Sequence, residues 1–306
     1  DSIEAVRSTA GEVLVDDKGL IQALYASNAG GMTADGSEAG GTALPYLTSV
    51  PSPDHAAAEG LLDWDHVVLP DGRIGYIRTD FTRETGKRNE AGFELLEVEG
   101  TDVNVRSAPY VDNTRNPAIA QVSEGDILIR IGQSRESNAY QWMAGPYSGE
   151  ELLASINRVA DPKIQGPLAS LTVTERGPSG RVLEVQANGR TISVKVPDDY
   201  RSAFMSVPST RFEVEGLSEF AILGAEGKTI VHQPSDGQLY AVSGSAPGAQ
   251  PVAKDAFLAM SRAGEARMLS QEARFRFVGM GYGHGMGMSQ WGAREMAAYM
   301  GYDYKQ

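Results

Sequence analysis

Apolar and polar residues alternate over short stretches along most of the chain, and most stretches end at Gly, Pro, Asn or Asp. A period of two places apolar side chains on one face of a β-strand. The turns Pro70-Asp71-Gly72 and Asn188-Gly189 between such stretches are typical of β-hairpins. We predict strands over 12–15, 20–27, 64–69, 73–78, 93–98, 103–106, 119–122, 126–131, 140–144, 171–175, 181–187, 191–196, 211–215, 220–223, 229–233, 238–242 and 273–278.

Helical patterns are fewer. The clearest begins at Ser148, which forms a capping box with Glu151 ahead of the run 152–159. Shorter helices are predicted over 198–205, 252–262 and 294–300. The predicted fold class is therefore α+β and β-rich: a mixed β domain with a few short helices, plus an inserted small β-barrel made by the strands between 61 and 147.

Length and composition restrict the function classes. The chain has 306 residues, enough for about two domains. It carries 27 basic and 40 acidic residues, a net charge of −13. This excludes nucleic acid or an anionic membrane surface as the main partner, because both require clustered Lys and Arg. No apolar run approaches the ~18 residues of a membrane span, so none is expected.

The absence of cysteine excludes disulfides, thiolate zinc sites and cysteine nucleophiles. The four histidines show no helical ligand-pair spacing, so we expect no metal. There is no P-loop, and no G-x-G of the 281–287 segment has the third glycine of a dinucleotide fingerprint. We therefore expect no cofactor.

Two glycine-rich segments are the candidate site. Strand alternation delivers Ser27 to the end of a strand, where Asn28-Ala29-Gly30-Gly31-Met32-Thr33 opens a loop that continues to about residue 41. Alternating glycines surround His284 in the second segment, just ahead of a helix start whose N–H groups would be free to bind a ligand. Each segment is either a groove wall that a ligand approaches closely or a tight structural turn. The polar stretch 49–54 is interpreted as a linker.

These segments resemble the stage II sporulation protein D / amidase enhancer (SpoIID/LytB) domain family. The resemblance covers residues 1–54 and 148–306. Its most specific part is the closing signature, which runs from Phe277 to Met296-Ala297. The matching residues are Ala5-Val6, Thr9, Gly11, Val13-Leu14, Ile21, Ala23, Tyr25, Ser27-Asn28, Gly30-Gly31, Thr33, Pro45-Tyr46-Leu47, Ser179-Gly180-Arg181, Phe277, Gly279, Gly281, Gly283-His284-Gly285, Gly287-Met288-Ser289-Gln290 and Gly292-Ala293.

The resemblance implies a bacterial protein that acts on peptidoglycan outside the cytoplasm, in the cell wall or the spore envelope. Sporulation members of the family are lytic transglycosylases that cleave peptide-stripped glycan strands and leave a 1,6-anhydro end. That reaction needs one carboxylic acid, because the sugar's own groups act as nucleophile. The implied substrate-binding residues are Ser27, Asn28, Gly30, Gly31, Thr33, Gly283, His284, Gly285, Ser289 and Gln290.

The chain departs from the family pattern at the catalytic acid. The family's Glu lies in an N-terminal segment that no part of this chain matches. Asp1 opens the chain without an initiator Met or a signal peptide, so we expect the acid upstream of residue 1, and the catalytic residue here is unknown. The carboxylates near matched motifs, Glu4, Glu12, Asp35 and Glu38, are interpreted as solvated surface charges.

A second resemblance lies between the two matched parts. Residues 100–109 are similar to the opening of a bacterial SH3-like domain, and 64–77 to its closing hairpin, in reversed order. This predicts an insertion: residues 1–60 and 148–306 form one domain, interrupted by an SH3-like barrel over 61–147. Four aromatic residues there either form a binding face or fill the barrel core: Trp64, Tyr76, Tyr110 and Trp142.

Two functions are compatible with these patterns. The first is an enzyme of the lytic transglycosylase type, acting on peptidoglycan glycan strands. The alternative is a non-catalytic peptidoglycan-binding module that recruits or enhances a cell-wall amidase, an N-acetylmuramoyl-L-alanine amidase. A groove between the 27–33 and 281–291 segments with an empty place for the acid favours the enzyme, and burial of both segments away from any groove opposes both functions. A purely structural β-rich scaffold is the third possibility, and it requires the two glycine segments to lie far apart.

Overall fold

The computed structural model describes residues 2–223, 227–242, 248–260 and 264–305. Within these residues, short helices accompany many short strands that form several separate sheets. The predicted α+β, β-rich fold class is confirmed. Nearly all strand pairs are antiparallel, as expected for short strands joined by tight turns.

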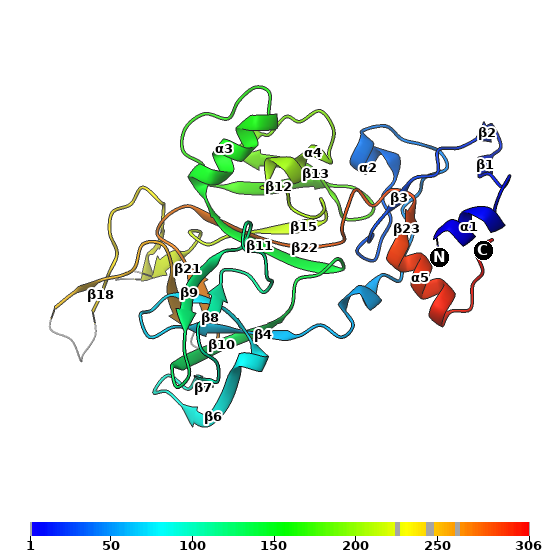
Figure 1. The fold of residues 1–306 in the computed structure, drawn as a ribbon. Coiled ribbons are helices and arrows are strands. Elements are labelled where there is room, and N and C mark those ends of the chain that lie inside the picture. Colours follow the sequence, from blue (N-terminus) through cyan, green and yellow to red (C-terminus); the bar gives the residue numbers. More distant parts are fainter. Residues whose placement is uncertain (1, 224–226, 243–247, 261–263, 306) are drawn as a thin grey trace.

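The largest sheet has seven strands and lies entirely within residues 63–135 (Figure 1, the cyan to teal strands). Its strand order is β6-β7-β10-β4-β5-β8-β9. The hairpin predicted at Pro70-Asp71-Gly72 is confirmed, because it joins β4 to β5. The strands are β4 (Asp63–Val68), β5 (Ile74–Arg78), β6 (Thr82–Arg88), β7 (Glu94–Val98), β8 (Val103–Arg106), β9 (Ala118–Val122) and β10 (Ile127–Arg135).

This sheet has its own apolar core, in which Val67, Ile77, Leu96 and Leu128 are fully buried or nearly so. The two segments that were expected to form an SH3-like barrel meet in this sheet, since Tyr76 of β5 pairs with Arg106 of β8. Strand β6 had not been predicted. Its sequence is polar throughout, and it is held by pairing with β7 rather than by burial.

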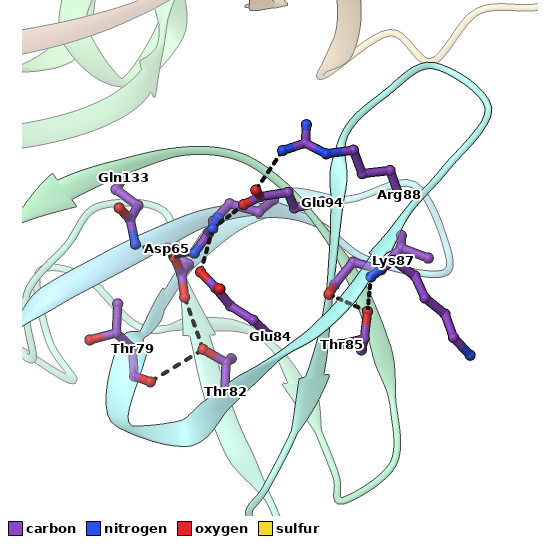
Figure 2. A network of polar contacts seen from close by, with 11 residues as sticks. Asp65, Thr79, Thr82, Glu84, Thr85, Lys87, Arg88, Glu94 and Gln133 are labelled. Atoms are coloured by element: carbon purple, nitrogen blue, oxygen red, sulfur yellow. Dashed lines mark hydrogen bonds and ion pairs between the residues drawn. The ribbon is translucent and has the colours of Figure 1, made fainter.

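A polar network ties β6 to the centre of the sheet (Figure 2). The buried Asp65 carboxylate accepts hydrogen bonds from Gln133 Nε2 and Thr82 Oγ1, both at 2.9 Å. The Arg130 guanidinium lies 3.5 Å from Asp65 and pairs with Glu84 and Glu94. A buried carboxylate is stable only when it is paired in this way.

The second core surrounds a three-stranded sheet with the order β11-β22-β15. Phe212, Phe275 and Phe277 of this sheet pack with Phe204 and Trp142. The strand predicted over 140–144 is β11, and it pairs with β22 rather than with the seven-stranded sheet. The strands are β11 (Gln141–Ser148), β15 (Phe212–Gly216) and β22 (Arg274–Met280).

Another small sheet and two helices lie on one side of this core (Figure 1). The sheet contains β12 (Leu171–Arg176), β13 (Val182–Ala187) and β14 (Arg190–Thr191). Asn188 and Gly189 both have positive φ, 52° and 72°, as the tight hairpin turn requires. The Ser148–Glu151 capping box is confirmed at the start of α3 (Gly149–Val159). The predicted short helix is α4 (Asp199–Ala203).

One predicted helix is wrong. Residues Phe257–Met260 form strand β20, which pairs with β21 (Ala266–Leu269), where a helix was expected over 252–262. A short run of consecutive apolar residues has no clear period, so cross-strand pairing decided its structure. Residues 261 and 262 of that prediction lie outside the described residues. The neighbouring hairpin strands are β16 (Ala221–Leu223), β17 (Thr229–Val231), β18 (Tyr240–Ala241) and β19 (Gln250–Pro251).

The two ends of the chain lie close together (Figure 1). The predicted early hairpin is shorter than expected, and the C-terminal helix begins earlier. The elements of this region are α1 (Ser2–Ser8), β1 (Val15–Asp16), β2 (Gly19–Leu20), β3 (Tyr25–Ala26), α2 (Gly36–Gly40), the 3₁₀ turns η1 (His55–Ala58) and, in the insert, η2 (Thr79–Phe81), then β23 (Met288–Ser289) and α5 (Gln290–Tyr299).

Candidate functional site

The two glycine-rich segments lie against each other, although more than 240 residues separate them in sequence. Strands β3 and β23 pair in parallel, with Tyr25 opposite Met288. The backbones of Asn28 and Tyr282 exchange two hydrogen bonds, of 3.2 and 2.8 Å. We call residues 27–34 and 281–292 the glycine joint. Long-range pairing has therefore brought the sequence-predicted site residues together.

Several glycines of the joint lie where another segment of the same chain passes too close to allow a side chain. A methyl group on Gly30 would come within 2.7 Å of the Gly281 nitrogen. On Gly285 it would overlap the Arg181 guanidinium, and on Gly287 the Leu24 carbonyl oxygen. Gly30, Gly281, Gly285 and Gly287 also have φ between 72° and 85°. A ligand was expected to approach these glycines closely. In the structure, other segments of the chain occupy that space.

Backbone N–H groups of the joint are engaged. Gly281, Gly283 and Met288 donate to the carbonyls of Tyr140, Pro208 and Leu24. At the start of α5, Trp291 N–H donates to Ser27 O, and Gly292 N–H to the N-cap Ser289 Oγ. Two of the N–H groups that were expected to be free at this helix start are therefore engaged, one of them by the first glycine segment.

Two arginines hold the carbonyls of the first segment. Arg181, fully buried, donates to Ala29 O and Met32 O, each at 3.0 Å. Arg211 donates to Gly30 O. Burial lowers the pKa of Arg181 to about 10, and the nearby Glu38 carboxylate partly opposes that shift. The joint is thus built around a buried positive charge.

Glu38 is not a surface charge, as had been interpreted. It is buried, and Oε1 accepts hydrogen bonds from Ser179 N and Ser179 Oγ at 2.8 and 2.7 Å. Ser179 Oγ in turn accepts from Arg181 Nη1 at 3.0 Å. Asp35 and Glu38 also form a capping box on α2, within the stretch expected to be loop. Helix α2 therefore contributes a buried acid to the joint.

The stretch 49–54 is not a free linker either. Asp54 is buried, and its carboxylate accepts hydrogen bonds from Gly31 N, at 3.0 Å, and from Ser289 Oγ. The Glu295 carboxylate, also buried, accepts from Ala56 N and lies 3.2 Å from His55 Nδ1. Both carboxylates therefore bind groups within the protein and attach the 52–56 segment to α5.

His284 is half-buried, and its Nδ1 accepts a hydrogen bond from Met286 N at 3.0 Å. Burial lowers its pKa below the usual value. The ring is therefore neutral at pH 7, and one of its nitrogens already serves the local turn. This contact belongs to the tight structural turn that the sequence left open beside ligand binding.

The candidate residues divide by accessibility. Asn28, Gly30, Thr33, Gly285 and Ser289 are buried inside the joint. Ser27, Gly31, Gly283 and His284 are half-buried, and Gln290 is exposed. Of this set, Ser27 lines the nearest cavity, together with Tyr282 of the second segment. The glycine joint therefore borders this cavity at Ser27 and Tyr282.

That cavity, of about 350 Å³, lies between the joint, strand β11 and the loops that carry Arg115 and Asn138. Its volume is within the usual range for small-molecule sites, ~300–1,000 Å³. Trp142, Tyr110, Tyr147 and Tyr282 supply its aromatic lining, so we call it the aromatic cavity. The other lining residues are Ser27, Arg115, Ser137, Asn138, Ala139, Met143, Ala144, Met205, Ser206, Val207 and Pro208, which include no carboxylate among the described residues.

The cavity wall stores backbone strain. Met205 and Ser206 are consecutive non-glycine residues with φ of 60° and 59°. Each such residue costs about 1 kcal/mol or more and persists only where its surroundings enforce it. Burial, with a smaller contribution from the neighbouring Tyr110, raises the pKa of Tyr147 to about 12. The phenols are therefore neutral hydrogen-bonding groups at pH 7.

Sequence reasoning had singled out Tyr110 and Trp142, but as part of the insert. Trp64 and Tyr76 are buried, as barrel-core residues would be. Trp142 is buried in the other core and donates to Gly281 O at 3.0 Å. Arg115, Tyr147 and Tyr282 had been missed as site residues. Only Tyr282 carried a local signal, since it lies inside the closing glycine signature.

Among the described residues, no group of three or more His, Asp and Glu side chains is placed to hold a metal ion. Within the same residues, no helix has the length and apolar character needed to cross a membrane.

A family model described as a domain of unknown function (DUF8618) matches residues 109–229. The matched segment includes Tyr110, Arg115 and the β11 and Met205–Pro208 walls of the aromatic cavity. It carries no assigned activity. No curated protein matches the chain.

Proposed function

We propose that this chain acts on bacterial peptidoglycan outside the cytoplasm, by holding a glycan strand in the aromatic cavity beside the glycine joint. One observation carries the proposal. The two segments that resemble the SpoIID/LytB domain family are joined in space, and they meet open space at a cavity lined by aromatic rings and small polar side chains.

The lining suits a sugar ring. Tyrosine and tryptophan faces stack on the apolar face of a pyranose, while Ser27, Asn138 and the phenols offer hydrogen bonds to its hydroxyl and acetamido groups. Tyr282 is 47% exposed, so its ring is available without rearrangement of the joint. The geometry supports binding most directly.

Binding is tested with glycan strands stripped of their stem peptides. We expect the chain to sediment with these strands, and Tyr282→Ala to raise the Kd about five- to tenfold through the loss of ~1 kcal/mol of ring contact. Tyr240→Ala is the matched control, because Tyr240 is 61% exposed and lies outside the cavity. Equal affinities for the two variants, or no sedimentation of the parent chain, would contradict the proposal.

The second candidate is lytic-transglycosylase cleavage at the same cavity, which the resemblance favours. Protonation of the leaving oxygen needs a carboxylic acid. Glu38, Asp54 and Glu295 are buried and committed to structural hydrogen bonds, so we propose that the acid comes from a segment upstream of Asp1. A protein carrying that segment should produce 1,6-anhydro-muramic ends, detected by mass spectrometry, and lose them when the upstream Glu is replaced by Gln. Intact strands that still bind favour the non-catalytic, amidase-recruiting alternative.

A further inference from the structure

A second cavity, of about 460 Å³, lies next to the aromatic cavity and shares Arg115 and Tyr147 with it. It is enclosed between the seven-stranded sheet and the β11–β22 pair. Four arginines line it, so we call it the arginine cavity: Arg73, Arg115, Arg274 and Arg276. Its carboxylates are Asp71, Glu151 and Asp255. This local excess of positive charge contrasts with the chain's net charge of −13.

The four arginines are not equally satisfied. Arg73 and Arg115 form close ion pairs with Asp71 and Asp112, at 2.6 and 2.8 Å. The nearest carboxylates of Arg276 and Arg274 are Glu215 at 3.6 Å and Glu272 at 3.9 Å, beyond hydrogen-bonding distance. Arg276 is only 8% exposed. Its Nη2 donates to the weak acceptor Met268 Sδ at 3.7 Å. A buried guanidinium with only such distant partners can accommodate a hydrogen-bonding anion.

Three buried nitrogens around this cavity lack partners among the described residues: Nε of Arg274, Nε of Arg276 and Nε2 of His66. Buried donors without partners are rare in folded proteins, and a bound ion or ordered water is the usual explanation. His66 stacks on Tyr76, with ring centroids 4.3 Å apart. Burial, together with a smaller contribution from the positive charge of Arg276, lowers the pKa of His66 to about 3.

We propose that the arginine cavity binds a carboxylate of the ligand whose sugar ring occupies the aromatic cavity. Arg276 and Arg274 provide the charge, and the shared Arg115 and Tyr147 connect the two cavities. A guanidinium binds a carboxylate through two parallel hydrogen bonds and is less strongly hydrated than an ammonium, so it suits an enclosed site. The identity of the ligand rests on the proposed function, whereas the carboxylate chemistry rests on this cavity alone.

Peptidoglycan offers two carboxylate sources, the lactyl ether of muramic acid and the free carboxyl end of a stem peptide. The test compares four probes: peptide-stripped strands, neutral oligomers of N-acetylglucosamine, a stem peptide, and free lactate. We expect stripped strands to bind at least tenfold more tightly than the neutral oligomers. Tighter binding of the stem peptide than of stripped strands would identify the peptide as the source.

Arg276→Gln should abolish the preference for the charged probe while leaving affinity for the neutral oligomer unchanged. Arg274→Gln, at a less buried position, repeats the test if Arg276→Gln does not fold. Arg267→Gln is the control, because Arg267 is exposed on β21 outside the cavity. Equal binding of charged and neutral glycans by the parent chain, unchanged in Arg276→Gln, would overturn the carboxylate site and leave the proposed function standing.

An independent readout is the His66 imidazole, followed by NMR. A bound carboxylate offsets the charge of Arg276, so the His66 pKa should rise when lactate or stripped strands are added, and stay unchanged with the neutral oligomer. If neither glycan binds, the proposed function fails, and lactate alone decides the inference. A His66 pKa that no carboxylate probe moves would overturn it.

Discussion

The glycine joint and the arginine cavity satisfy their polar groups to different degrees, although Nε of Arg181 in the joint also lacks a partner among the described residues. In the joint, carbonyls and carboxylates are paired with partners from distant segments, such as Arg181 with Ala29 O and Glu38 with Ser179. Around the arginine cavity, Arg274, Arg276 and His66 keep buried nitrogens without partners. Polar residues that satisfy one another hold a fold together, whereas residues left unsatisfied beside open space are candidates for ligand contact.

Sequence signals are likewise unequal in the two regions. The most distinctive motif of the chain, the closing glycine signature, serves the joint. The cavities are lined by scattered residues such as Tyr110, Tyr147 and Arg276, which no motif marks. The glycine pattern therefore identified where two segments pack against each other. The aromatic cavity lies at the edge of that region, beside Ser27 and Tyr282.

The largest expected effect is in the joint. Gly287→Ala should destabilise the protein by at least about 4 kcal/mol, because the methyl group would overlap the Leu24 carbonyl and φ is +72°. Gly301→Ala is the matched control, with φ of +73° and no atom near the added methyl group, and it should cost only about 1 kcal/mol. Chemical denaturation measures both. Similar losses would show that conformation, and not close packing, requires the glycine.

The next effect is on the pH dependence contributed by the arginine cavity. The pKa of His66 is about 3 in the folded protein, against 6.5 for an unperturbed imidazole such as that of the unfolded chain. The unfolded chain therefore binds the extra proton between these values, so stability is fully present above pH 6.5 and falls as the pH drops toward 3. His66→Phe should remove up to about 5 kcal/mol of this pH dependence. Parallel pH–stability curves for the two proteins would contradict the burial of a neutral His66.

A smaller loss is expected from Glu38→Gln. The substitution removes the carboxylate that supports the buried charge of Arg181 and places an amide among donors from Ser179 and Asp35. We expect a loss of about 2 kcal/mol. Glu150→Gln, on the exposed first turn of α3, should cost no more than about 0.5 kcal/mol. Equal stability of the two variants would refute a structural role of Glu38.

The smallest expected effect is a gain in the stability of the protein from a substitution in the wall of the aromatic cavity. Ser206→Gly removes the penalty of φ +59° at an exposed residue and should stabilise the protein by about 0.5–1 kcal/mol. Ser193→Gly, at an exposed residue without positive φ, should destabilise it by a similar amount. Thermal unfolding of both variants measures the difference, and a loss of stability in Ser206→Gly would show that this backbone is not strained.

Local sequence was sufficient for most elements of the fold. Turn chemistry at Asn188-Gly189 and the capping box at Ser148 act over a few residues, so they are readable from the chain alone and are confirmed. The predicted helix over 252–262 was wrong because its apolar run has no distinct period, and pairing with residues 266–269 made it a strand. Strand β6 was missed because partner strands, not its own polar sequence, hold it.

The sequence by itself determined the β-rich class, the main turns and the presence of two unusual glycine segments, since these depend on backbone preferences and short-range periodicity. Only the tertiary structure decided what surrounds those segments. It buried Glu38 and Asp54, which read as surface and linker residues, and it assembled two cavities from residues up to 255 positions apart, Ser27 to Tyr282. Charge pairing and enclosed volume arise between distant segments, so neither can be read from local pattern.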